Sequence, residues 1–202
     1  VKHKSCFVMC ASPERYIKKQ NQYVWSQPIK GTAKRGIDSE SDKQLIEDLK
    51  NNPKERAENV MIVDLVRNDL SKIASKGSVE VTEFCEIYTF THVHQMISTI
   101  QCQVSEDLKP FQIIAATFPM GSMTGAPKKR TMEIIEELED HKRSLYSGAI
   151  GYISPQNDFD FNVVIRSLLY NEEKKYASLS VGSAVTFKAN VETEFQECLL
   201  KA

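Results

Sequence analysis

Several segments of this sequence combine residue types that do chemistry in proteins. One is a glycine-rich stretch, PMGSMTGAPKKR at residues 119–130, in which Pro127 is the kind of residue favoured at the first position of a helix. A helix amino terminus that emerges from such a loop presents unpaired N–H groups and a partial positive charge, which suit a carboxylate or a phosphate. The spacing differs from that of a Walker loop. A plain helix start remains the alternative.

Acidic residues supply a second candidate, a divalent-cation site. Glu194, Glu197 and Lys201 recur at helical spacing and would share one face, although such a face, taken alone, is commonly a solvated one. Glu58 lies in a segment rich in apolar residues, where a carboxylate without a partner is costly. Two carboxylates on different helices could share Mg²⁺, whose preference for oxygen ligands fits a site completed by an anionic substrate.

Lys30 is a candidate nucleophile. It lies in the segment QPIKGTAKRG, flanked by proline and glycine and followed closely by two further cations. A lysine near other cations, or in an apolar pocket, has a lowered pKa, and its neutral amine is a nucleophile. A surface lysine in a turn is the alternative. His92 and His94 would face the same side of an expected strand, but no third ligand lies at a metal-binding spacing, so we expect no metal there.

Composition excludes several function classes. A length of 202 residues fits one full domain with a sizeable core. The 26 basic and 27 acidic residues give a net charge of −1, so the chain lacks the electrostatic footprint of a general nucleic-acid binder and any polyanion site must be local. The sequence has no apolar run of about 20 residues and no signal-peptide pattern. Five cysteines at unpatterned spacings indicate reduced thiols. We expect a cytoplasmic protein that binds neither nucleic acid nor membrane.

The periodicity of apolar residues predicts the elements that must position these side chains. Helical spacing covers residues 39–52, 54–73, 109–118, 127–138 and 191–201, and strand-like patterns cover residues 6–11, 96–104, 145–154, 160–170 and 176–187. The helix at 54–73 is apolar on most of its circumference, so we expect it to be buried on more than one side. With no repeat or linker, the pattern predicts one compact α/β mixture of antiparallel sheet covered by helices.

Six motifs follow one another in a fixed order: SPERY, PIKGTAKRG, AENVMIVDLVRNDL, GSMTGAPKKR, LYSGAIGY and VVIRS. Together they resemble the chorismate-utilising enzymes, over about residues 12–201. Within that superfamily, the PIKGT form with lysine at position 30 resembles the aminodeoxychorismate synthases (component I, or para-aminobenzoate synthase component I). Anthranilate synthases carry alanine at that position.

The resemblance implies a fold and a domain. The fold is α/β (α+β), with two orthogonally packed, mainly antiparallel sheets flanked by helices, as in anthranilate synthase component I. The family domain has further strands before SPERY, and only eleven residues precede Ser12 here. We therefore expect residues 1–202 to be the C-terminal major part of a chorismate-binding catalytic domain. Without the N-terminal strands, one sheet would have an exposed edge or be completed by another chain segment.

The resemblance also implies roles for individual residues. Lys30 would attack C2 of chorismate and expel the 4-hydroxyl, and Glu14 in SPERY would protonate the departing hydroxyl as general acid and base. Glu58 and Glu197 match the Mg²⁺ ligands, and the metal would hold the ring carboxylate. Arg166 suits a bidentate grip on the enolpyruvyl carboxylate. The remaining residues at substrate-binding positions are Thr32, Tyr146, Gly182 and Lys201.

Two departures from the family pattern bear on the product. Gln95 stands where the family has a histidine followed by Leu-Val-Ser-Thr, and His94 lies one residue earlier. That histidine is associated with pyruvate elimination in anthranilate formation, so glutamine is tolerable in an enzyme that keeps the pyruvyl group. The family's GxG motif after the last strand is Gly182, Ser183, Ala184 here. Alanine in place of the second glycine leaves the backbone less room to approach the substrate.

The implied activity is amination of chorismate to 4-amino-4-deoxychorismate, in para-aminobenzoate and folate biosynthesis. Ammonia entering at C4 would displace the lysine, and a separate glutamine amidotransferase subunit would deliver that ammonia. One alternative is anthranilate synthase component I. Another, motivated by the short amino terminus and Gln95, is a non-catalytic remnant that binds chorismate or an amidotransferase.

Overall fold

The computed structural model describes residues 1–187 and 189–202. Over these residues the chain is an α+β fold with two antiparallel sheets and five α-helices, which confirms the predicted fold class. The chain divides into two compact units. The larger unit comprises residues 14–140 and 151–162, and the smaller unit comprises residues 1–13, 141–150 and 163–202.

The larger sheet has seven strands in the order β5-β7-β4-β3-β9-β8, with β6 paired to β7. The strands are β3 (Arg15–Gln20), β4 (Tyr23–Gln27), β5 (Ile29–Lys34), β6 (Glu80–Thr89), β7 (Val93–Gln103), β8 (Ala149–Ile153) and β9 (Phe159–Val163). β7 lies at the centre because it pairs with β4, β5 and β6. Residues 94–100 of β7 are all buried, so the predicted strand at 96–104 is confirmed, with an earlier start.

Strands β4 and β5 both pair with β7, one after the other along its length. Pro28, which is buried, separates them, because a proline has no N–H to continue the hydrogen-bonded ladder. Its carbonyl still accepts a hydrogen bond from the Ser98 N–H at 3.3 Å. The sequence pattern did not predict strands at residues 15–34, where polar residues interrupt the alternation of apolar ones.

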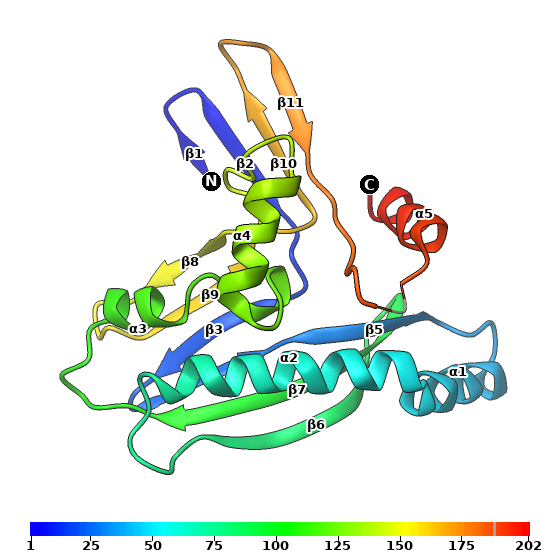
Figure 1. Cartoon of the computed structure of the whole chain (residues 1–202), viewed down its shortest axis with the longest axis horizontal. Helices are drawn as coiled ribbons and strands as arrows, with labels where there is room; N and C mark the ends of the chain where they lie inside the picture. The colour runs from blue at the N-terminus through cyan, green and yellow to red at the C-terminus, as the bar shows by residue number, and fades with distance from the viewer. Residues whose placement is uncertain (188) are drawn as a thin grey trace. The chain divides into compact units, whose positions relative to one another are not determined.

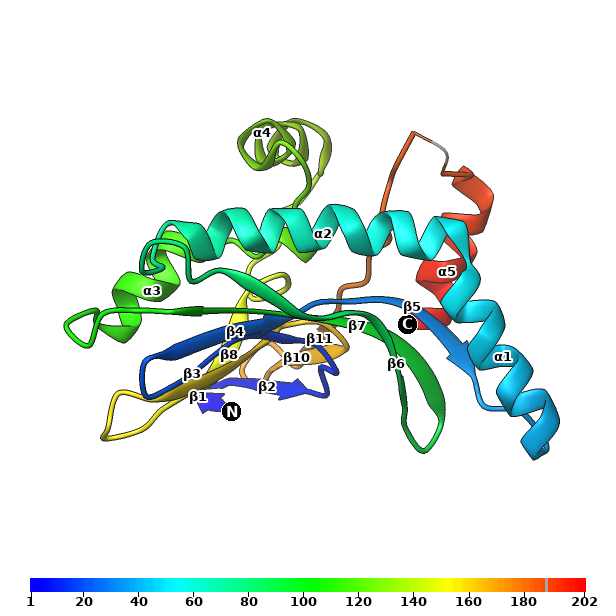
Figure 2. The ribbon, with the colours of Figure 1, turned by 90° about the horizontal axis from the view of Figure 1, so that it is seen from below.

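Helices α1 (Ser39–Asn51) and α2 (Pro53–Ser71) follow β5 and begin at side-chain caps. The Asp38 carboxylate accepts hydrogen bonds from the N–H groups of Glu40 and Ser41, and the Asn52 side chain does the same for the first turn of α2. The α2 helix lies along one face of β5, β7 and β6 (Figures 1 and 2). Both helices are confirmed within two residues of their predicted ends.

The α2 helix contacts both the sheet and the segment at residues 110–123, but its outer face is exposed, so the predicted burial on more than one side is incomplete. Ile62, Val66 and Leu70 are buried, whereas Val60 is 43% exposed. Asp64 on the outer face is exposed and forms an ion pair there with an arginine one turn along. Apolar residues such as Val60 extend the apolar circumference without any element covering them.

Three short elements follow β7 in the larger unit: α3 (Pro110–Thr117), a 3₁₀ turn η1 (Gly121–Met123) and α4 (Lys128–Leu138). They confirm both predicted helices. Pro127 caps α4 and is not its first residue. No residue of α4 is buried, although the helix is amphipathic in sequence.

The smaller unit contains a four-stranded antiparallel sheet in the order β1-β2-β10-β11 and one helix. Its elements are β1 (Lys2–His3), β2 (Cys6–Cys10), β10 (Ser167–Asn171), β11 (Tyr176–Leu179) and α5 (Val191–Lys201). The strand predicted at 6–11 and the helix predicted at 191–201 are confirmed. Among the described residues, β1 and β11 are the edge strands of this sheet.

The C-terminal strands differ from their predicted extents. The single strand predicted at 160–170 is two strands, β9 and β10, which belong to different sheets. Arg166 lies at the break with a φ of +50°, and the apolar run through residues 163–165 hides this change of direction in the sequence. The strand predicted at 176–187 ends at Leu179, and the strand predicted at 145–154 begins only at Ala149.

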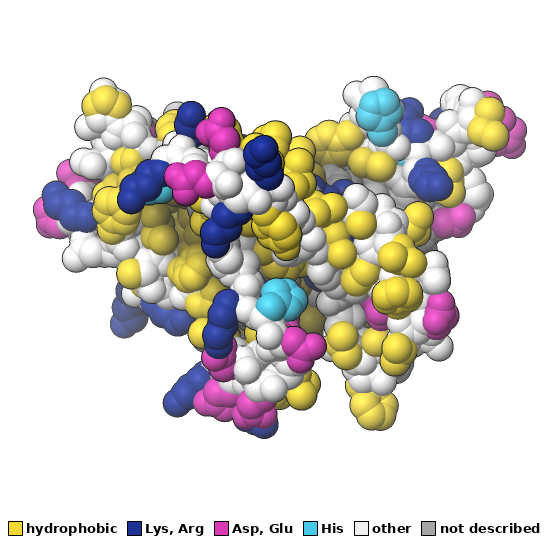
Figure 3. Space-filling model, turned by 90° about the horizontal axis from the view of Figure 1, so that it is seen from above, with side chains coloured by type: hydrophobic (Ala, Val, Ile, Leu, Met, Phe, Trp, Pro, Cys, Tyr) yellow, Lys and Arg dark blue, Asp and Glu magenta, His cyan; other side chains and the backbone are white. Residues whose placement is uncertain are grey.

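Basic and acidic side chains are interspersed on the face shown in Figure 3, as expected for a net charge of −1. Within the part of the chain that the structure describes, no helix has both the length and the apolar character needed to cross a membrane.

Candidate active site

Lys30 lies in a bulge of β5. The β5–β7 register pairs Ile29 with Ile97 and then Thr32 with Gln95, so β5 carries one extra residue between these pairs. Gly31 occupies this bulge with a φ of +89°, in the left-handed region that favours glycine. The bulge changes the direction in which the strand presents the Lys30 side chain.

Glu58 on α2 lies beside this lysine. Its side chain is 13% exposed, and its Oε2 atom is 3.8 Å from Lys30 Nζ. Lys54, one turn earlier on α2, places its Nζ atom 4.0 Å from the Oε1 atom of Glu58. The next residue, Asn59, accepts a hydrogen bond from Ser98 Oγ at 2.6 Å, which fixes this turn of α2 on β7.

Glu14, which immediately precedes β3, completes this group in the larger unit. It is 7% exposed, and burial raises the pKa of its carboxyl to about 7, against the opposing effects of a Ser122 hydrogen bond and the Lys30 charge. A carboxyl with that pKa carries a proton about half the time near neutral pH, so it can both give and accept one. The structure therefore brings together Glu14, Lys30 and Glu58, as the sequence predicts.

Thr32 and Gln95 face one another across the β5–β7 pair. Thr32 is exposed, and Gln95, which stands in place of the family histidine, is 8% exposed. Directly paired residues of antiparallel strands project from the same face of the sheet. The predicted substrate-binding threonine and the departure at position 95 therefore share one face.

In the smaller unit, Lys201 connects the end of α5 to the segment after β11. Its Nζ atom donates to the Gly182 carbonyl at 3.1 Å and lies 2.5 Å from Glu197 Oε1. A Cβ atom at Gly182 would lie 2.7 Å from Tyr146 Oη, so only glycine allows this approach. Four of the five predicted residues of the smaller unit, namely Tyr146, Gly182, Glu197 and Lys201, are thus neighbours.

The fifth, Arg166, stands between β9 and β10. It is exposed, and its carbonyl accepts a hydrogen bond from the Ala11 N–H at 3.2 Å. Its positive φ marks the point at which the chain leaves one sheet for the other.

Three polar residues of these groups were given no role by the family resemblance. Ser122 in η1 donates a hydrogen bond to Glu14. Ser183 donates to Glu197 Oε2 at 3.2 Å and to Glu194, which is 8% exposed. The spacing of Glu194 and Glu197 on one helical face was a usable signal for Glu194, whereas no spacing rule points to the two serines.

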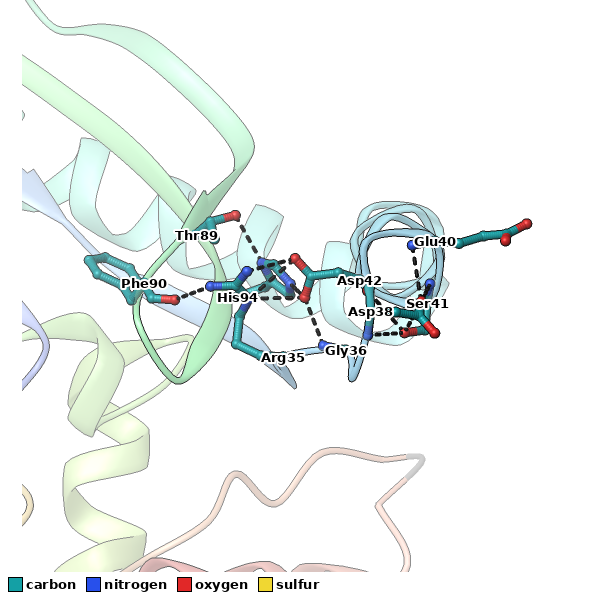
Figure 4. Close-up of polar contacts among 9 residues, drawn as sticks. All are labelled: Arg35, Gly36, Asp38, Glu40, Ser41, Asp42, Thr89, Phe90 and His94. Carbon is teal, nitrogen blue, oxygen red and sulfur yellow. Dashed lines mark hydrogen bonds and ion pairs between the residues drawn. The ribbon is translucent and has the colours of Figure 1, made fainter.

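His94 has a structural environment of its own. Its Nε2 atom lies 2.9 Å from Asp42 Oδ1 and its Nδ1 atom 2.9 Å from Thr89 Oγ1 (Figure 4). Asp42 also accepts hydrogen bonds from Arg35 and from the Gly36 N–H, and the Arg35 guanidinium is the main reason why the pKa of this carboxyl lies well below its usual range. This cluster joins the end of β5 to α1 and β7.

The sequence pattern predicted that His92 lies in one strand with His94, and this prediction is wrong. β7 begins at Val93, and His92 is exposed in the turn before it. Among the described residues, no group of three or more His, Cys, Asp or Glu side chains has a geometry that could hold a metal.

A cavity of about 330 Å³ lies elsewhere in the larger unit, near the β3–β4 turn and the turn before β9. Its lining is mostly polar and includes Lys19, Asn21, Glu106, Lys109 and Asp158. None of the predicted site residues lines it, so this cavity carries no part of the candidate chemistry.

Sequence comparisons show the family to which the chain belongs. Residues 1–202 match the family described as chorismate binding enzyme, so the chain belongs to that family. It is 45% identical to the chloroplastic aminodeoxychorismate synthase of Arabidopsis thaliana over 95% of this chain and 21% of that protein. It is 41% identical to aminodeoxychorismate synthase component 1 of Bacillus subtilis over 96% of this chain and 41% of that protein.

Solved structures support the same fold. The crystal structure of anthranilate synthase component I from Streptococcus pneumoniae superposes with a TM-score of 0.87 at 35% identity, covering 98% of this chain and 43% of that one. The chain thus spans between about a fifth and about two fifths of the length of these relatives.

Proposed function

We propose that this chain carries the catalytic residues of an aminodeoxychorismate synthase component I, which aminates chorismate with ammonia to 4-amino-4-deoxychorismate. The observation that carries the proposal is the group formed by Lys30, Glu58 and the protonatable Glu14. The similarity to two aminodeoxychorismate synthases, at 45% and 41% identity, supports it.

In the first step, the neutral amine of Lys30 forms a bond to C2 of chorismate. The ring double bonds shift, the C4–O bond breaks, and Glu14 gives its proton to the departing hydroxyl, which leaves as water. A carboxyl with a pKa of about 7 suits this transfer because it holds a proton at neutral pH and still releases it readily. The nitrogen of Lys30 carries the positive charge of the adduct.

In the second step, ammonia forms a bond to C4 while the bond between C2 and the lysine nitrogen breaks. The double bonds shift back, Lys30 leaves as a neutral amine, and the new amino group holds the positive charge. Its excess proton returns to the Glu14 carboxylate, so both residues are restored. The net reaction converts chorismate and ammonia to 4-amino-4-deoxychorismate and water, and the pyruvyl group is kept.

Glu58 and Glu197 are the proposed Mg²⁺ ligands. Each oxygen of Glu58 is paired with a lysine nitrogen, Oε2 with Lys30 Nζ at 3.8 Å and Oε1 with Lys54 Nζ at 4.0 Å, and a bound Mg²⁺ would compete with these two pairs. An all-carboxylate donor set is the kind that Mg²⁺ prefers. When bound, the metal would hold the ring carboxylate of chorismate and neutralise its charge.

The other residues hold the substrate in this proposal. Arg166 has the planar fork that binds a carboxylate through two parallel hydrogen bonds, which suits the enolpyruvyl group. Thr32, Tyr146 and Lys201 supply polar contacts, and Gly182 allows the backbone to come close. Ammonia would come from a glutamine amidotransferase subunit, since the Bacillus subtilis relative is named as a component of a synthase.

Anthranilate synthase component I is the second candidate. The chain is 39% identical to the component 1 enzyme of Aquifex aeolicus over 96% of its length. Lys30 and Gln95 oppose it, since the first introduces a nucleophile and the second removes the histidine associated with pyruvate elimination.

Product analysis distinguishes the candidates. The full-length protein that contains this chain is incubated with chorismate, Mg²⁺ and ammonium, and the products are separated and weighed by mass spectrometry. We expect 4-amino-4-deoxychorismate, which a lyase converts to para-aminobenzoate. Fluorescent anthranilate formed without a lyase would refute the proposal in favour of the second candidate, and chorismate binding without turnover would indicate a non-catalytic remnant.

A further inference from the structure

Ser122, which donates a hydrogen bond to Glu14, lies in the loop at residues 118–127 between α3 and α4. The position of Ser122 therefore depends on what holds this loop. The helix that follows offers little help, because no residue of α4 is buried. The contacts that fix the loop must lie at its ends and along its inner side.

Lys128, the first residue of α4, is bound at the end of the loop by several groups. Its Nζ atom donates to the Pro119 carbonyl at 2.6 Å, to the Thr117 carbonyl at 3.3 Å and to the carboxylate of Asp69 on α2. Its side chain is 17% exposed, and burial lowers the pKa of the amine against the raising effect of Asp69. One nitrogen thus joins the two ends of the loop to each other and to α2.

Asp69 is itself buried, at 5% exposure, and also accepts a hydrogen bond from Lys72 at 2.9 Å. A second contact between the loop and α2 lies four residues earlier on the helix. A Cβ atom added at Gly121 would be 3.0 Å from Leu65 Cβ, so the loop backbone rests directly on α2 beside Ser122.

The apolar packing under the loop is incomplete. A cavity of about 20 Å³, close to the volume that one water needs, is lined by Tyr16, Val66, Asp69, Thr117 and Gly121, among others. The loop spans this small void and leads into an unburied helix, so polar contacts at its ends help to hold it in place, beside the buried Met120 side chain. Lys128 supplies three of these contacts.

We infer that Lys128, held by Asp69, is a positioning residue that places Ser122 against Glu14. The inference rests on the proposed function, since it assigns Lys128 an effect on the acid–base step through Ser122. Neither Lys128 nor Asp69 touches the reacting atoms in this scheme. Their substitution should therefore lower kcat and leave KM nearly unchanged.

The test uses the full-length protein, four main variants and one supplementary variant. The main variants are Lys128→Met, Ser122→Ala, the double variant and Lys129→Met, in which the exposed neighbouring lysine serves as the matched control. Asp69→Asn is a milder variant that keeps the shape of the aspartate if Lys128→Met folds poorly. Chorismate consumption gives kcat and KM whatever the product, and hydrogen exchange of peptides covering residues 118–127 reports on the loop.

We expect Lys128→Met to lower kcat between about 10-fold and 10²-fold, the range in which a misplaced group affects an active site. KM should change less than about twofold, and the double variant should be no slower than the slower single variant, because both changes remove the same interaction. Exchange in the loop should increase in Lys128→Met and Asp69→Asn and stay unchanged in Lys129→Met.

Two results would overturn the inference. One is a kcat of the double variant that is lowered by the product of the two single effects. The other is hydrogen exchange in the loop that Lys128→Met leaves unaltered. A wild-type protein that does not consume chorismate would refute the proposed function instead. The loop-exchange arm would then still decide whether Lys128 positions the loop.

Discussion

Lys30 Nζ lies 3.8 Å from Glu58 Oε2, although the two residues belong to a strand and a helix that are separated by the whole of α1. The bulge at Gly31 makes this approach possible, because it adds one residue to β5 and changes the direction of the lysine side chain. A turn lysine on the surface would have no such partner. This pairing favours the reading of Lys30 as a site residue.

Replacing Lys30 tests the covalent mechanism. Lys30→Ala should reduce amination of chorismate about 10³-fold or more, because it removes the proposed nucleophile. The free energy of unfolding should change little, as it does for most substitutions outside a core. The measurement is product formation by mass spectrometry beside a urea unfolding curve.

Lys34→Ala is the matched control, since Lys34 is an exposed lysine on the same strand. Its activity should stay within about twofold of the wild type, as expected for a surface change. Wild-type protein held with chorismate in the absence of ammonia should show a mass adduct on the peptide that contains Lys30. Full activity of Lys30→Ala together with no adduct would remove the covalent mechanism.

Glu14 should make stability depend on pH. The pKa of Glu14 in the folded protein, about 7, lies above the ordinary value of 4.5. Between pH 4.5 and pH 7 the folded protein therefore holds a proton that the unfolded chain has already lost. The stabilisation is therefore complete below about pH 4.5 and is lost as the pH rises through 7. Glu14→Gln removes this dependence.

The free energies of unfolding of the wild type and Glu14→Gln, measured in urea at pH 5 and pH 7.5, check this prediction. As the pH rises from 5 to 7.5, the glutamine variant should gain stability relative to the wild type, on the order of a few kcal/mol in the free energy of unfolding. The same variant should lose about 10²-fold to 10⁴-fold in activity at every pH, because it has no acid–base group. A pH-independent difference in stability would show that Glu14 is ionised in the fold.

The helices were predictable from the sequence, and the strands were less so. Helical spacing acts locally, so it predicts the ends of α1 and α2 within two residues. Strands β4 and β5 depend on pairing with β7, and β3 depends on pairing with β9, all far along the chain, and the polar residues of these strands hide the alternation. The turn at Arg166 depends on a backbone angle, which side-chain polarity does not report.

The candidate site was predictable only in part for the same reason. Motif resemblance pointed to Lys30, Glu14 and Glu58, and the structure brings these three together. Ser122 was missed because its role depends on burial and on a contact with a distant segment. A lone serine in a glycine-rich loop gives no local signal of the carboxyl it will meet.

Gly31 should tolerate alanine poorly. Its φ of +89° disfavours any side chain, and an added Cβ would lie 3.0 Å from Leu49 Cδ1 and 3.2 Å from Glu55 Oε2. Gly31→Ala should therefore cost roughly 2–4 kcal/mol of unfolding free energy and lower activity, because the bulge that presents Lys30 must move.

Gly77→Ala separates strain from crowding. Gly77 has a similar φ of +76°, but an added Cβ meets nothing within 4 Å, so its cost should be only the backbone strain, about 1–2 kcal/mol. Urea unfolding of both variants gives the difference due to crowding. Equal losses in the two variants would show that Leu49 and Glu55 give way without cost.

Gly182 and Tyr146 should show coupled effects on substrate binding. A Cβ atom at Gly182 would lie 2.7 Å from Tyr146 Oη but 3.8 Å from Tyr146 Cζ, so the clash involves the phenolic oxygen alone. Gly182→Ala should displace the tyrosine and raise KM for chorismate by about tenfold.

Tyr146→Phe removes the oxygen that clashes, so the double variant provides the control. On its own, Tyr146→Phe should raise KM by a few fold, since it removes the substrate hydrogen bond proposed for Tyr146, of about 1 kcal/mol. In the Tyr146→Phe background, adding Gly182→Ala should raise KM no further, because ordinary van der Waals distance is restored. Multiplying effects in the double variant would mean that Gly182 acts on the substrate directly, through its own backbone, and not through the position of Tyr146.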